Sequence, residues 1–252
     1  MQEADAIVIG GQAVNIWAVH YRGKYPELLQ YAPFTSKDID FFSSGEAARL
    51  LAGALDGELL VPDPDDHSPN AALVVASLDG RRIEIDFMNT VLGVEDRAIR
   101  NNFVTLEALH DTRKIRVLLL HPLDCLRSRL ANINTLKRHD TQSINQAKTA
   151  LIVIRAFIDE LLALGTPHTK KLACSILHDL FYIVRDECLG EAAHLRHGIS
   201  PADVMRHFRG DIRLDERWRT LTLDPSIQRI EAKYIGYEER QKARALAKAR
   251  HE

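Results

Sequence analysis

The chain has 252 residues, of which 46% are hydrophobic, and its 33 lysines and arginines nearly balance its 35 aspartates and glutamates. A chain of this length can bury a substantial core in one large domain or two, whereas its longest apolar runs, such as residues 71–76, are too short to span a bilayer. Its three cysteines have no Cys-x-x-Cys spacing, which fits reduced thiols in the cytoplasm better than a disulfide framework.

The first predicted element is a short apolar strand over residues 6–10. The residues before it include Glu3 and Asp5 and no basic lead, so we expect no signal peptide. The strand begins so close to Met1 that an alternative or truncated start of the chain is compatible with the sequence.

Two glycines, Gly10 and Gly11, separate this strand from a helix predicted over residues 12–21, where apolar residues recur at helical spacing. Glycines at a strand–turn–helix junction let the backbone approach a phosphate closely, and the helix N-terminus offers unpaired N–H groups to an anion. Because many α/β turns contain glycine, this junction indicates a phosphate site only together with the acidic strands that follow.

Two acidic strands are predicted over residues 38–43 and 82–88. Alternation of acidic and apolar residues places Asp38 and Asp40 on one face of the first strand and Asp86 on one face of the second. Three carboxylates on neighbouring strands repel one another unless a cation lies between them, and oxygen ligands are those that Mg²⁺ takes. The alternative interpretation is an exposed strand edge with scattered acids.

The other elements of this region are short. Further strands are predicted over residues 72–77 and 115–120, helices over 45–55 and 105–110, and an exposed loop over 61–70. Short strands interleaved with helices indicate an α+β fold, with a small mixed β-sheet backed by helices.

Only helical periodicities follow residue 120. We therefore predict a catalytic domain over residues 1–120 and an all-helical C-terminal domain over residues 121–252. The first carries a charge balance of −7 and the second of +5. An acidic half that collects a metal and a basic half that meets phosphates would suit a nucleotide or RNA substrate. A solvated helical surface with a basic tail explains the same charges equally well.

Other catalytic motifs are missing from the sequence. It contains no Gly-x-Ser-x-Gly elbow, no Gly-x-Gly-x-x-Gly run and no Gly-Lys-Ser/Thr phosphate loop. His194 and His197 are spaced for one helix face, but no carboxylate or cysteine stands at metal-ligand spacing, so surface histidines are favoured over a zinc site.

The order of the motifs resembles the nucleotidyltransferase superfamily, the fold of DNA polymerase beta and of the antibiotic nucleotidyltransferases. That family has an apolar strand, Gly-Gly or Gly-Ser, Asp-x-Asp, and a third Asp one or two strands later. The likeness is closer to the AbiEii-type toxins, which have Gly-Gly-Thr-Ala and Ser-x-Asp-Ile-Asp-Phe where this chain has Gly-Gly-Gln-Ala and Ser-Lys-Asp-Ile-Asp-Phe. The resemblance covers residues 6–90 and fades beyond residue 140.

The chain departs from the toxin pattern at two places. Gln12 stands where the family has a small hydroxyl residue. Further on, the toxins have a Lys followed by an Arg-Asp-x-x-Asp-Leu-like helix. Here Arg129 stands for the Lys, Asp140 for the first Asp and Ser143 for the second.

The resemblance implies two-metal nucleotidyl transfer, with two Mg²⁺ ions and a nucleoside triphosphate as substrate. In this mechanism Asp38, Asp40 and Asp86 are both the catalytic residues and the metal ligands. The residues that would bind the nucleotide are Gly10, Gly11, Gln12, Ser36, Lys37 and Arg129.

Three functions follow as hypotheses. The first is a toxin-like nucleotidyltransferase that modifies RNA or another macromolecule and is held in check by an antitoxin protein. The second is a small-molecule enzyme of the antibiotic-modifying type. The third is a non-catalytic, nucleotide-binding member of the fold, against which the retention of all three carboxylates argues. If the acceptor is RNA, we expect Arg129 and Arg138 to be the basic residues nearest the site.

Overall fold

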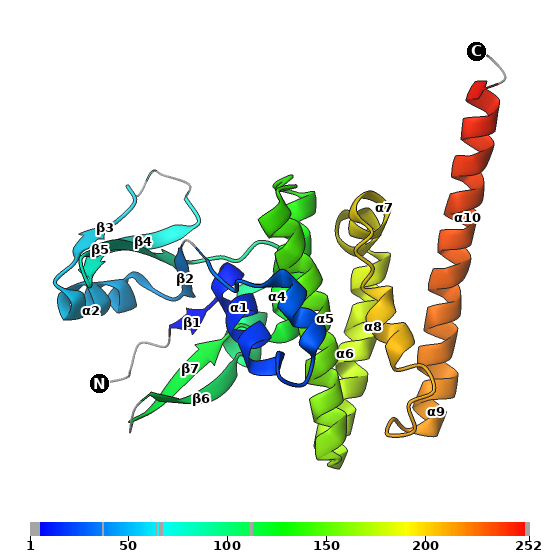
Figure 1. Ribbon diagram of the computed structural model, residues 1–252, viewed down its shortest axis with the longest axis horizontal. Helices are drawn as coiled ribbons and strands as arrows, with labels where there is room; N and C mark the ends of the chain where they lie inside the picture. The colour runs from blue at the N-terminus through cyan, green and yellow to red at the C-terminus, as the bar shows by residue number, and fades with distance from the viewer. Residues whose placement is uncertain (1–5, 37, 64, 66–67, 111–112, 250–252) are drawn as a thin grey trace. The chain divides into compact units, whose positions relative to one another are not determined.

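The computed structural model describes residues 6–36, 38–63, 65, 68–110 and 113–249, and for residues 108–110, 113 and 238–249 the backbone only (Figure 1). It divides into two compact units, Met1–Ala156 and Phe157–Glu252. Helices and one seven-stranded mixed sheet make up its regular structure, so the predicted mixture of helix and sheet is confirmed. No helix among the described residues is long and apolar enough to cross a membrane.

The sheet lies wholly in the first unit. Its strands are β1 (Ile7–Val8), β2 (Ile39–Phe42), β3 (Glu58–Leu60), β4 (Asn70–Leu78), β5 (Arg81–Met88), β6 (Val104–His110) and β7 (Arg113–Leu119). They are arranged in the order β3-β4-β5-β2-β1-β7-β6. β1 is parallel to β7 and β2 is parallel to β5, whereas the other neighbouring pairs are antiparallel. The two strands predicted to carry the acids are therefore direct neighbours.

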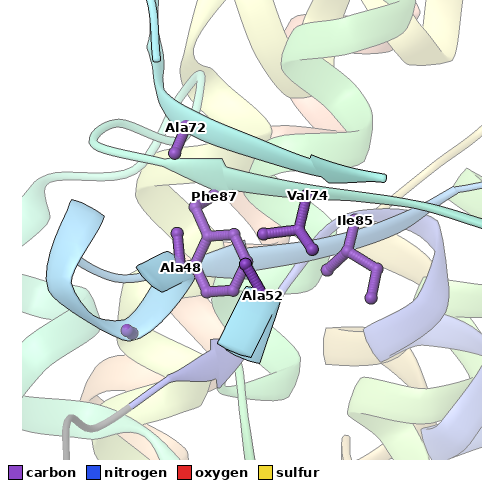
Figure 2. Packing of buried hydrophobic residues seen from close by; sticks show 7 residues of the cluster. Ala48, Ala52, Ala72, Val74, Ile85 and Phe87 are labelled. Carbon is purple, nitrogen blue, oxygen red and sulfur yellow. The ribbon is translucent and has the colours of Figure 1, made fainter. Parts of the chain in front are cut away.

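Helix α2 (Gly45–Leu55) packs against β4 and β5 and covers one face of this part of the sheet. Figure 2 shows Ala48 and Ala52 of the helix beside Val74, Ile85 and Phe87 of the strands. Because successive side chains of a strand point to opposite faces, burial of Ile85 and Phe87 turns the residue between them away from α2. The predicted alternation along β5 is confirmed.

The first unit contains several other helices besides α2. They are α1 (Gly10–Tyr21), the 3₁₀ helix η1 (Pro26–Tyr31), α3 (Asp96–Asn102), α4 (Pro122–Asn134) and the first part of α5 (Thr141–Leu164). α1 and α4 pack together, and Trp17 Nε1 of α1 donates a hydrogen bond of 3.0 Å to the Leu120 carbonyl at the end of β7. The first unit extends to Ala156 and so includes α4 and the first part of α5.

A buried histidine caps α4. His121 Nδ1 accepts a hydrogen bond of 3.2 Å from the Leu123 amide, and Pro122 occupies the first helical position. Burial lowers the pKa of His121 to about 4, with the positive charge of Arg127 adding to the effect, so the ring is neutral and able to accept at pH 7. This cap fixes where α4 begins after β7.

Two elements of the sheet differ from expectation. The helix predicted over residues 105–110 is wrong, because these residues form β6, which pairs along its whole length with β7. β3 was not anticipated, and it pairs with β4 at the edge of the sheet. In both cases pairing with the next strand along the chain outweighs the local preference of a short segment.

The regular elements among the described residues of the second unit are all helical. Besides the end of α5 it contains α6 (Pro167–Arg185), the π-helical turn η2 (Glu187–Glu191), α7 (Ala192–His197), α8 (Ala202–His207), α9 (Glu216–Trp218), the π-helical turn η3 (Arg219–Leu223) and α10 (Asp224–Ala249). His194, expected on the surface, is instead half-buried and stacks on Tyr234 with ring centroids 4.1 Å apart.

Candidate functional site

Two of the predicted carboxylates lie side by side on the face of the sheet opposite α2. β2 and β5 pair in parallel with Asp40 and Asp86 as register partners. One position further along both strands, Phe41 and Phe87 stack on the core side with ring centroids 5.5 Å apart. The alternation of side chains in both strands therefore directs Asp40 and Asp86 to the same, opposite face.

The acids at this face repel one another. Burial raises the pKa of Asp40, and the negative charges of Asp86 and Asp38 raise it further. The pKa of Asp86 is raised by burial and then by Asp38 and Glu84. Asp38 is exposed just before β2, and Asn70 Nδ2 donates a hydrogen bond of 3.2 Å to Asp86 Oδ1. The three predicted carboxylates thus form one electrostatically coupled group.

The turn at Gly10 is shaped around Asp40. The Ile9 amide donates to the Asp40 carbonyl at 2.9 Å, and Gly10 has a φ of +65°. A Cβ atom on Gly10 would stand 1.9 Å from Asp40 Oδ2, so any side chain at this position would displace the carboxylate. Glycine is favoured here both by the left-handed backbone and by the close approach of the carboxylate.

A half-buried arginine joins α4 to α5 beside this turn. Arg129 Nη1 donates to Gln146 Oε1 at 2.9 Å, and a Cβ atom on Gly11 would stand 2.4 Å from Gln146 Nε2. Burial lowers the pKa of Arg129, and the negative charge of Asp40 opposes that effect. In turn, Arg129 and Arg138 oppose the rise in the pKa of Asp40. The Arg129 Nε atom is buried and has no hydrogen-bond partner among the described residues.

Two hollows of the first unit meet at these side chains, and Asp38, Asp40, Arg129 and Arg138 line both. The Asp86 hollow has a volume of about 650 Å³, and its other lining residues include Asn70, Asp86, Met88, Val91, Leu92 and Leu136. The Gln146 hollow has a volume of about 400 Å³ and is also lined by Gly11, Ser36, Asp140, Gln142, Ser143 and Gln146. The first is partly apolar, whereas the second is lined mainly by polar groups.

The structure brings most of the predicted nucleotide-binding residues to these hollows. Gly10 lines the Asp86 hollow, and Gly11 and Ser36 line the Gln146 hollow. Gln12 is half-buried on α1 and lines neither hollow. Lys37 lies outside the described residues.

The segment that resembles the toxin helix begins α5. The Asp140 carboxylate accepts hydrogen bonds from the Ser143 amide at 2.9 Å and the Ser143 hydroxyl at 2.7 Å, and these bonds lower the pKa of Asp140. Asp140 therefore caps the helix, and its charge is engaged locally although it lines the Gln146 hollow.

Sequence reasoning missed two residues that hold the site together. Asn70 reaches Asp86 only because β4 pairs with β5, and Gln146 reaches Arg129 and Gly11 only because α5 lies against α4 and α1. Neither residue belongs to a motif. Asn70 follows a run of turn formers, and Gln146 lies one turn after the start of a helix, so no local signal distinguishes them.

The donor set suits a hard divalent cation. Asp38, Asp40 and Asp86 line one hollow, offer oxygen only, and carry like charges whose repulsion a cation would relieve. Among the described residues, however, no three His, Cys, Asp or Glu side chains converge into a metal-binding group. The carboxylates are neighbours that would have to draw together around an ion.

No family model matches the chain, and no curated protein or solved structure is significantly similar to it.

Proposed function

We propose that the chain is a Mg²⁺-dependent nucleotidyltransferase that transfers a nucleoside monophosphate from a nucleoside triphosphate to a hydroxyl group of RNA or another macromolecule. The observation that carries the proposal is the in-register pair Asp40 and Asp86 beside the Gly10 turn. An isolated acidic strand edge does not require a glycine turn fitted to one carboxylate. The motifs resembling AbiEii-type toxins support a toxin held in check by an antitoxin protein.

The Gln146 hollow suits the triphosphate. Arg129 and Arg138 provide positive charge there, and Ser36, Gln142 and Ser143 provide polar groups. The planar guanidinium group is suited to two parallel hydrogen bonds to a phosphate. The buried Nε of Arg129 keeps an unused donor beside its bond to Gln146, so small side-chain movements can redirect the group towards an anion.

The Asp86 hollow suits the acceptor. Asp86 lines this hollow and not the Gln146 hollow, so its carboxylate can receive the proton of a hydroxyl that enters there. Asn70 donates to one of its oxygens and leaves the other available. The acceptor hydroxyl would therefore approach from the side opposite the leaving pyrophosphate, as in-line displacement requires.

The reaction would then proceed as follows. The acceptor oxygen forms a bond to the α-phosphorus, the bond from that phosphorus to the bridging oxygen breaks, and pyrophosphate leaves towards Arg129 and Arg138. Asp86 takes the proton of the hydroxyl. Mg²⁺ held by Asp38, Asp40 and Asp86 would neutralise the charge that develops on the phosphates and lower the pKa of the hydroxyl.

A second candidate acceptor is favoured by one observation. The Asp86 hollow has the size of a small-molecule site, and Met88, Val91, Leu92 and Leu136 give part of its wall an apolar surface. A small hydroxylated compound, such as an antibiotic, would bury its apolar face there. RNA needs only to place one terminal hydroxyl in the same hollow.

Transfer of label tests the proposal. The protein is incubated with Mg²⁺, total RNA and each nucleoside triphosphate labelled at the α-phosphate, and the RNA is then examined. We expect label in RNA from at least one nucleotide, lost with a chelator and with Asp40→Asn. Asp79→Asn, which removes an exposed charge from the β4–β5 turn, is the matched control and should retain activity. Failure to label RNA or any small hydroxylated acceptor would contradict the proposal.

A further inference from the structure

A third hollow of the first unit lies next to the Gln146 hollow and has no place in the mechanism above. The Tyr31 hollow has a volume of about 420 Å³ and lies between the end of η1 with the following segment on one side and α5 on the other. It shares Ser36, Gln142 and Gln146 with the Gln146 hollow. A ligand with phosphates at Arg129 could therefore extend into it without leaving the protein surface.

The Tyr31 hollow differs in charge from its neighbour. The described residues that line it include no Asp, Glu, Lys or Arg, whereas Asp38, Asp40, Arg129, Arg138 and Asp140 line the Gln146 hollow. A phosphate group gains little in such a neutral site, but an uncharged polar ring loses little on entering it. The boundary between the two hollows thus separates a charged end from a neutral end.

One wall of the Tyr31 hollow offers flat, half-buried surfaces. The half-buried Tyr31 and Phe34 line it together with the exposed Pro33, and burial raises the pKa of the Tyr31 hydroxyl. Aromatic rings in such a wall are suited to stacking on a planar heterocycle, and this contact tolerates any nucleobase because every base has a π-face.

The opposite wall offers amide and hydroxyl groups. Asn145, Gln142 and Thr149 of α5 line it, together with Asn15 of α1. The Asn15 side chain is 6% exposed, and its Nδ2 atom has no hydrogen-bond partner among the described residues. A buried donor without a partner costs stability, and a ligand that supplies an acceptor would recover that cost. Amide side chains can pair with the edge of a base through adjacent donor and acceptor groups.

From this arrangement we infer that the Tyr31 hollow binds the nucleobase of the donor nucleotide, which stacks on Tyr31 and Phe34 and forms hydrogen bonds with Asn15 and Asn145. The inference rests on the proposed function, since it assigns the remainder of the nucleotide whose triphosphate occupies the Gln146 hollow. It makes the protein selective for a nucleotide over a bare polyphosphate.

Calorimetric titration tests the inference without turnover. Wild-type protein with Mg²⁺ is titrated with ATP, GTP, CTP, UTP and inorganic tripolyphosphate. At least one nucleotide should bind about 10-fold or more tightly than tripolyphosphate, and Phe34→Ala should weaken that nucleotide about 5- to 150-fold. Asn145→Ala should weaken it as well, and neither variant should change tripolyphosphate binding. Leu29→Ala, which removes an exposed side chain of η1 outside the hollow, is the control for truncation of that segment.

The outcomes separate the inference from the function on which it rests. Equal affinity for nucleotides and tripolyphosphate, or equal weakening of both ligands by Phe34→Ala and Asn145→Ala, would overturn the nucleobase assignment and leave the triphosphate site standing. Binding of neither ligand in the presence of Mg²⁺ would overturn both.

Discussion

The close contact between Gly10 and Asp40 predicts a specific pattern of stability losses. Gly10→Ala forces a Cβ atom onto a residue with a φ of +65°, and that atom would stand 1.9 Å from Asp40 Oδ2 and 2.9 Å from its Cγ. The backbone strain alone costs about 1 to 2 kcal/mol. Displacing the Asp40 carboxylate from its rotamer adds about 0.5 to 1.5 kcal/mol, and more if the turn must open.

Gly80 provides the matched control. It has a φ of +74° in the turn between β4 and β5, and a Cβ atom there would meet nothing within 4 Å. Gly80→Ala therefore carries the backbone strain without the clash and should cost about 1 to 2 kcal/mol, whereas Gly10→Ala should cost about 2 to 4 kcal/mol. In an Asp40→Ala background the cost of Gly10→Ala should fall to that of Gly80→Ala.

Chemical denaturation of the four variants measures these free energies of unfolding, and the double-mutant cycle isolates the contact between Gly10 and Asp40. The reasoning is refuted if Gly10→Ala and Gly80→Ala cost the same, or if removing the Asp40 carboxylate leaves the cost of Gly10→Ala unchanged. Either result would mean that the carboxylate does not lie against the turn.

Four further predictions follow from the same site. Asp38→Asn and Asp40→Asn should each abolish transfer, and each should leave the free energy of unfolding equal or higher because one of several mutually repelling charges is removed. Transfer assays and chemical denaturation measure the two effects. Unchanged Mg²⁺–nucleotide binding in both variants would contradict the assignment. Asp86→Asn should lower kcat far more than nucleotide affinity in steady-state kinetics, and normal kcat with weakened nucleotide binding would point to Glu84 instead. The pKa of Asp40 is raised in the folded protein, so the contribution of Asp40 to stability is greatest at low pH and is lost as pH rises from 3.8 through the folded pKa. Asp40→Asn should therefore reduce the loss of unfolding free energy over this pH range, measured by denaturation at a series of pH values. The same pH dependence in the wild type and the variant would contradict this prediction. If the acceptor is RNA, the affinity for RNA should fall steeply as the salt concentration rises, and Arg129→Ala combined with Arg138→Ala should reduce this dependence on salt. No RNA binding at low salt would favour a small acceptor.

The sequence could predict the part of the site that depends on the alternation of acidic and apolar residues along single strands. Asp40 and Asp86 are flanked by apolar residues at a period of two, and that pattern alone determines which face each side chain occupies once the strands form. Helix α2 likewise runs over the predicted residues 45–55, since its alanines and leucines both favour helix and suit the face of the sheet. These features depend on neighbours in the chain.

The missed features depend on contacts between one element and another. Residues 104–110 contain good helix formers, yet they form β6, which pairs with the edge of β7. Asn70 reaches Asp86 next to an irregularity in the register of β4 against β5, which no single strand encodes. Gln146 is one of several polar residues on the first turns of α5, and only the position of Arg129 on another helix makes it structural.

Different charged groups shift the pKa of Asp40 and the pKa of Asp86. Arg129 and Arg138 oppose the rise in the pKa of Asp40, so the protein itself supplies part of the positive charge that this carboxylate requires. The pKa of Asp86 is raised by burial and by the negative charges of Asp38 and Glu84. Burial and repulsion together therefore outweigh the attraction of the two arginines at Asp40, whose pKa stays raised.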